Sequence, residues 1–150
     1  MENVPILEKE HSVKLLRECD AGVKTAMNSI KEVLGNIDSA ALRKGLTDSL
    51  NKHEYIKNQI DTILCSLSEE GKEPNPMARI MSWAKINMKL LPDPDDKTVA
   101  KLMFDGCNMG ISQVSGYLND YSQADARSKE MAEKLVEVED ELAQFLRQYL

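Results

Sequence analysis

Apolar residues recur along the chain at alternating spacings of three and four positions. This spacing is the period of an amphipathic α-helix, whereas a half-buried β-strand would place an apolar residue at every second position. Glycine, proline and short polar runs divide the pattern into long segments, and no segment has the alternation of a strand. The sequence therefore predicts an all-α protein.

The first segment predicts a helix over residues 12–34, with Ser12 as its N-cap. Gly35 and Asn36 follow the last apolar position and supply the stop. Residues 1–11 precede the helix and are expected to be flexible. The apolar face of the helix consists of Val13, Leu16, Cys19, Val23, Ala26, Met27, Ile30, Val33 and Leu34.

The second segment predicts a helix over residues 40–67, which Asp38 or Ser39 can cap. Its apolar seam alternates by four and three and consists of Leu42, Leu46, Ser49, His53, Ile56, Ile60, Ile63 and Leu67. The first two helices are therefore expected to form a hairpin, with the imidazole of His53 facing the core.

A long crossover, residues 68–95, separates this hairpin from the rest of the chain. It contains an amphipathic segment over residues 77–91 that predicts an extra short helix, which Pro92 and Pro94 end. The larger side chains expected to pack on the bundle are Met77, Met81, Trp83 and Met88. If the segment lifts, the same face would become a surface for a protein partner.

The remaining chain predicts a second hairpin, with helices over residues 96–119 and 125–150. The seam of the third helix consists of Ala100, Phe104, Cys107, Ile111, Val114, Leu118 and Tyr121. The seam of the fourth consists of Ser128, Met131, Leu135, Val138, Leu142, Phe145 and Tyr149. Gly106, Gly110 and Gly116 each cost the third helix about 1 kcal/mol relative to alanine, so close helix approach or self-association is the expected reason for them.

The two hairpins share a short sequence echo. CDAGV at residues 19–23 matches CNMGI at residues 107–111, with identical cysteine and glycine and with paired Asp/Asn and Val/Ile. Because a crossover of this length can span the bundle, the second and third helices are expected to run parallel.

Two hairpins, a long crossover and polar residues at mid-bundle resemble the ferritin-like superfamily, and in particular its small bacterial branch of domains of unknown function. The local similarity lies in ECDAG, in the histidine of the second helix and in SWAKINMK of the crossover. The resemblance implies an up-down four-helix bundle over residues 1–150, with an extra short helix in the crossover.

Metal-binding members of that superfamily use one Glu from each of two helices and Glu-x-x-His from the other two. This chain has Leu50-Asn51-Lys52-His53 and Glu139-Asp140-Glu141-Leu142 where the two motifs would stand, so half of each motif is missing. Counting outward from the hairpin turns predicts a mid-bundle polar cluster of Asp20, His53, Asn108 and Glu139. The metal-ligand candidates for iron or manganese are Asp20, His53 and Glu139, with Asp105 or Glu18 as substitutes.

A structural role for His53 is the competing interpretation. The imidazole would then hydrogen-bond to Asp20, Tyr55, Tyr117 or another polar group, because an unpaired buried polar side chain costs about 1 to 3 kcal/mol. The acidic run Glu137, Glu139, Asp140 and Glu141 is typical of a solvated helix face, with Glu139 as its inward member.

Composition narrows the function classes. The chain of 150 residues has a formal charge of −6, which disfavours binding to nucleic acid through phosphates, and it has no apolar run of transmembrane length. Its three cysteines are widely spaced, which favours a reduced cytoplasmic environment. No nucleophile-and-base motif is present: His11 falls in the expected flexible segment, and Cys19 and Cys107 fall on apolar faces.

Two functions are therefore predicted. The preferred one is a non-catalytic ferritin-like bundle with a structural or protein-interaction role, as a homodimer or with another protein partner, and without a cofactor. The alternative is an iron- or manganese-binding oxidoreductase or iron-handling protein that uses the reduced ligand set.

Overall fold

The computed structural model describes residues 3–67, 69, 71, 83–91 and 93–150. The long helices are α1 (Asn3–Leu34), α2 (Ala40–Ser66), α5 (Asp96–Asp120) and α6 (Ala126–Leu146), joined by the short α4 (Trp83–Met88) and a terminal 3₁₀ turn, η1 (Arg147–Tyr149). No strand occurs among these described residues, which confirms the prediction of an all-α fold.

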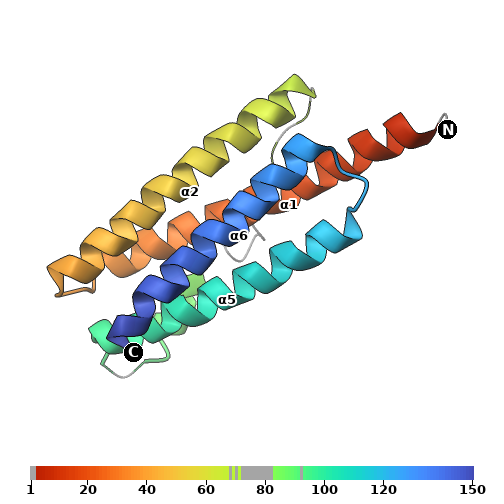
Figure 1. Cartoon of the computed structure of the whole chain (residues 1–150). Coiled ribbons are helices and arrows are strands. Elements are labelled where there is room, and N and C mark those ends of the chain that lie inside the picture. The colour runs from red at the N-terminus through yellow and green to blue at the C-terminus, as the bar shows by residue number, and fades with distance from the viewer. Residues whose placement is uncertain (1–2, 68, 70, 72–82, 92) are drawn as a thin grey trace.

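The four long helices lie side by side as two hairpins (Figure 1). α1 and α2 run in opposite directions, α5 and α6 do likewise, and α2 and α5 run in the same direction, as the long crossover led us to expect. α1 packs against α2 and α5, and α6 packs against the same two helices, and each of these pairs is antiparallel. α1 and α6 also contact each other and run in the same direction. α4 lies against α1 and α5.

The start of α1 differs from the prediction, because the helix begins at Asn3 and not at Ser12. Ser12 caps nothing: it is fully buried, and its Oγ accepts a hydrogen bond of 2.8 Å from the backbone N–H of Asp125. His11, expected in a mobile segment, accepts a 3.0 Å hydrogen bond on Nδ1 from the backbone N–H of Gln123. These two bonds dock the α5–α6 turn on α1, whereas the expected flexibility of residues 1–11 stays a prediction.

The start of α2 confirms the predicted capping by Ser39, and the starts of α5 and α6 have caps that the sequence analysis did not assign. Ser39 caps α2 by accepting a hydrogen bond from the N–H of Leu42, and Asp95 forms a capping box with Thr98 at the start of α5. Asp125 caps α6, which ends at Leu146 and continues only as the η1 turn. The α1–α2 turn therefore lies where Gly35, Asn36 and the capping serine placed it.

The crossover helix is shorter in the described residues than the amphipathic segment from which it was predicted. α4 covers residues 83–88, and residues 77–82, with Met77 and Met81, lie outside the described part of the chain. Ala84 is buried, and Met88 packs against the core as expected.

The turn between α1 and α2 is held to the start of α5. The carboxylate of Asp96 accepts 2.9 Å hydrogen bonds from the backbone N–H groups of both Asp38 and Ser39. Arg43 donates to the carbonyls of Leu34 and Ile37, which leaves those acceptors at the end of α1 satisfied. This end of the bundle is therefore tied by charged side chains that bind backbone groups.

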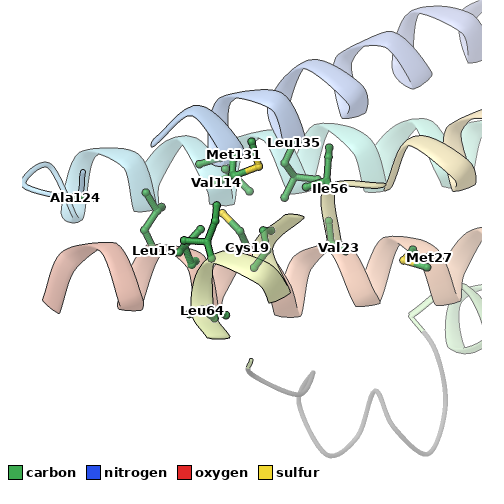
Figure 2. Close-up of a cluster of buried hydrophobic side chains, with 14 residues drawn as sticks. Leu15, Cys19, Val23, Met27, Ile56, Leu64, Val114, Ala124, Met131 and Leu135 are labelled. Atoms are coloured by element: carbon green, nitrogen blue, oxygen red, sulfur yellow. The ribbon is translucent and has the colours of Figure 1, made fainter. Parts of the chain in front are cut away.

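The core consists of two apolar clusters along the bundle axis. One lies toward the α5–α6 turn and includes Leu15, Cys19, Ile56, Val114 and Leu135 (Figure 2). The other lies toward the α1–α2 turn, with Ile30, Leu42, Leu46, Leu142 and Leu146 among its members. In the described part of the chain, no helix is both long and apolar enough to cross a bilayer.

Candidate functional site

A buried polar layer lies where the two apolar clusters meet. His53 supplies its imidazole from α2, between Leu46 of one cluster and Ile56 of the other, and the side chain is 0% exposed. Glu139 faces it from α6, between Leu135 and Leu142 of the same two clusters. The seam spacing that buries the leucines and isoleucines therefore buries these two polar residues as well.

The first hydrogen bond of His53 determines its tautomer. Nδ1 lies 2.8 Å from the carbonyl oxygen of Ser49, one turn earlier on α2. A carbonyl oxygen can only accept, so Nδ1 carries a proton and donates it. The nitrogen that remains for a neighbouring helix is therefore Nε2.

Nε2 of His53 lies 2.5 Å from Oε1 of Glu139, whose side chain is only 9% exposed. Two bare lone pairs would repel at this separation, so one proton lies between the two atoms. With that proton on either atom the pair is neutral overall, either as imidazolium and carboxylate or as imidazole and carboxylic acid. The bond joins α2 to α6 without burying net charge.

α5 completes the layer with Cys107 and Gly110. Burial, and then the neighbouring Glu139 carboxyl to which the thiol hydrogen-bonds, raises the pKa of Cys107 well above its usual range. A Cβ added at Gly110 would lie 3.6 Å from the carboxyl carbon of Glu139, so this glycine faces the layer. The same effect of burial raises the pKa of Cys19 to about 12, so both thiols are held in their unreactive protonated form, as their apolar positions predicted.

Asp20 is buried, but its carboxylate does not face the predicted cluster with His53 and Glu139. Its Oδ2 lies 2.7 Å from Nζ of Lys24, and Gly71 of the crossover packs directly against its carboxylate. Asn108, the equivalent position in the sequence echo, is exposed. Of the four residues expected at mid-bundle, the structure therefore brings together His53 and Glu139, and the expected four-residue cluster is wrong.

The substitute ligands also lie elsewhere. Asp105 is exposed on α5 and pairs with Lys101 at 2.8 Å, and Glu18 is only partly buried. Within the described residues, no three His, Cys, Asp or Glu side chains are placed so that they could hold a metal ion together. The geometry thus offers the metal-binding alternative no support.

A surface groove lies directly outside the His53–Glu139 pair. On one side α2 contributes Asn51, Lys52, Tyr55 and Ile56, which flank His53 in the sequence. Tyr55 is 59% exposed, so the prediction that it could hydrogen-bond to His53 is wrong. The aromatic ring instead stands at the edge of the groove.

The opposite wall comes from α6. It contributes Lys134, Glu137, Val138 and Glu141, which flank Glu139, and the groove has a volume of about 400 Å³. Lys52 and Glu141 join the two walls through an exposed ion pair of 2.8 Å. The buried pair thus holds together the two helices whose outer faces form the groove.

Sequence reasoning found the inward member of the acidic run correctly, since Glu139 is buried and Glu137, Asp140 and Glu141 are exposed. It missed the carbonyl of Ser49 as the partner of Nδ1, although an acceptor one turn earlier is within reach of any histidine on a helix. It also missed Cys107 in the polar layer, because a thiol on an apolar stripe was assigned to packing alone.

Comparisons of the chain with models of protein families, with curated proteins and with solved structures found no match.

Proposed function

We propose that this chain is a non-catalytic interaction protein that binds a protein partner through the groove between α2 and α6. The observation that carries the proposal is the position of Tyr55, which is 59% exposed beside an open apolar groove. Tyrosine is enriched among the residues that dominate binding energy, because it combines a large apolar ring with a polar tip.

The buried layer supports a structural role beneath that surface. His53 and Glu139 are closed off from solvent, and each of their facing atoms is engaged in the hydrogen bond between them. A catalytic acid or base has to reach its substrate, and neither group has such access in the folded bundle. We assign the pair to fixing the separation of α2 and α6, and with it the shape of the groove.

The proposal includes a ferritin-like arrangement of the bundle. Two antiparallel hairpins with α2 and α5 in the same direction support it, as does the short helix in the crossover. Leu50 stands where a ligand carboxylate would be needed, which agrees with a member of this architecture that has exchanged its metal site for packing.

Site-specific photocrosslinking tests the proposed surface. A benzoylphenylalanine replaces Tyr55 in the full-length chain, in cells that make the protein at its natural level. Met109 of α5, 43% exposed and outside the groove, is the matched position. We expect a discrete crosslinked product from position 55 and none from position 109, whereas no product from position 55 would count against the groove as a binding surface.

A further inference from the structure

We infer that the partner bound in the α2–α6 groove is a second copy of this chain, with the two copies related by a two-fold axis. This inference rests on the groove being a binding surface, and it names the occupant.

The charged residues that line the groove cancel one another, whereas the whole chain carries a net negative charge. Its charged lining consists of two lysines, Lys52 and Lys134, and two glutamates, Glu137 and Glu141, so its formal charge is zero. The whole chain carries −6. Two copies therefore repel each other overall, and a contact through the groove face adds no excess of like charge at the interface to that repulsion.

The charges are also arranged for self-recognition. A two-fold interface is self-complementary: if residue i of one copy faces residue j of the other, then j faces i. Lys134 and Glu137 are three positions apart on α6 and both line the groove, so they project from the same side of the helix. When two α6 helices cross antiparallel with the axis between these residues, each Lys134 faces Glu137 of the other copy.

Tyr55 supplies the apolar part of the contact. Each copy presents the exposed Tyr55 beside the apolar groove, so an exchange of the two rings uses both features in both copies and closes at a dimer. The glycine-bearing face of α5 is a weaker candidate for self-association, because Gly110 faces Glu139 of its own bundle.

The first experiment measures the association of the purified full-length chain by sedimentation equilibrium. We expect a reversible dimer, and a Kd weakened about tenfold or more by Tyr55→Asp. Met109→Asp, which adds the same charge outside the groove, should leave the Kd unchanged. A natural chain that stays monomeric up to about 100 µM, or equal weakening by both variants, would overturn the inference.

The second experiment tests the pairing itself. Lys134→Glu and Glu137→Lys should each weaken the dimer by about tenfold, since each places like charges opposite one another. The double exchange restores opposite charges and should return the Kd to within about threefold of the natural value. Additive weakening in the double variant would overturn the two-fold arrangement, and far-UV circular dichroism checks that each variant is folded.

The outcomes separate this inference from the proposed function. A product at position 55 with the mass of two chains supports both. A product of another mass, together with a monomeric purified chain, overturns the second copy as occupant and leaves the groove as a binding surface. Absence of both product and dimer overturns both.

Discussion

Two acid–base pairs join α2 to α6 at almost the same level of the bundle, and they differ chiefly in their exposure. His53–Glu139 spans 2.5 Å with side chains 0% and 9% exposed, whereas Lys52–Glu141 spans 2.8 Å with side chains 56% and 47% exposed. Both contacts connect the same helices. A difference in how much each pair contributes to stability therefore reflects mainly its exposure to solvent.

The exposed ion pair between Lys52 and Glu141 adds little to the free energy of unfolding. Water solvates Lys52 and Glu141 in the folded and unfolded chain, and dissolved salt screens their attraction. The hydrogen bond to Glu141, followed by the charge of that carboxylate, raises the pKa of Lys52, but the ammonium is already charged at neutral pH. The contact therefore orients two side chains on the groove wall more than it stabilises the fold.

The buried pair matters for stability because removal of one partner would leave the other buried without a hydrogen bond. Neither His53 nor Glu139 can turn to water if its partner is removed, so the remaining group would keep an unsatisfied buried atom. The pair is thus costly to break although its net contribution to folding can be small.

The largest effect is expected from Glu139→Ala, which leaves Nε2 of His53 buried without a partner. The free energy of unfolding, measured by urea denaturation, should fall by about 3 to 5 kcal/mol. Glu141→Ala removes the equivalent carboxylate of the exposed pair and should change stability by less than about 1 kcal/mol. Equal losses in the two variants would show that burial does not distinguish the pairs.

Glu139→Gln should have an intermediate effect. The amide keeps the shape of the side chain and can donate to the free lone pair of Nε2, because Nδ1 already holds the ring proton. The loss should be about 1 to 2 kcal/mol, since a neutral hydrogen bond replaces a charge-assisted or shared-proton bond. Nitrogen NMR of His53 should then show protonated Nδ1 and unprotonated Nε2. A reversed tautomer would contradict the assignment made from the Ser49 carbonyl.

Gly110→Ala should stabilise the protein by about 0.5 to 1 kcal/mol, because alanine favours the helix and its Cβ would make an ordinary contact 3.6 Å from Glu139. The shift is measured as an increase in the urea midpoint. Gly45→Ala is the matched control with the opposite sign, since a Cβ there would overlap the ring of Phe145. A loss of stability in the Gly110 variant would mean that the polar layer requires closer helix approach than the geometry indicates.

The smallest effect is expected from Lys52→Ala, at about 0.3 kcal/mol. Raising the salt concentration from low ionic strength to about 1 M should abolish that difference, because the Debye length then falls to about 3 Å. The loss caused by Glu139→Ala should persist in the same salt. Parallel denaturation curves in both solutions provide the measurement.

The sequence predicted the long helices because each has an apolar seam with the period of a helix, and Ser39 supplied the correct cap for α2. The apolar seams also predicted that His53 lies inward, and counting outward from the two hairpin turns gave the level of each polar residue along the bundle. That count gives no direction around the helix axis. Asp20 and Asn108 each follow a buried cysteine, yet Asp20 lies beneath Gly71 of the crossover and Asn108 faces solvent.

The groove could not be predicted in the same way. It depends on the separation of α2 and α6 and on the rotamer of Tyr55, which no spacing along a single helix determines. The start of α1 escaped prediction for a related reason: Ser12 has the chemistry of a cap, but its partner is the N–H of Asp125, far along the chain. Capping rules consider only hydrogen bonds between residues that are close in the sequence, whereas the hydrogen bond of Ser12 is a tertiary contact.

The hydrogen bond from His53 to Glu139 also makes the bundle sensitive to sliding. If α6 shifted by one turn in either direction, Leu135 or Ala143 would stand opposite Nε2, and neither can accept or donate. The apolar clusters alone would tolerate such a slip, because one aliphatic side chain can replace another. We therefore expect His53 to fix the axial register of α2 against α6. With one register permitted, a single set of residues lines the groove.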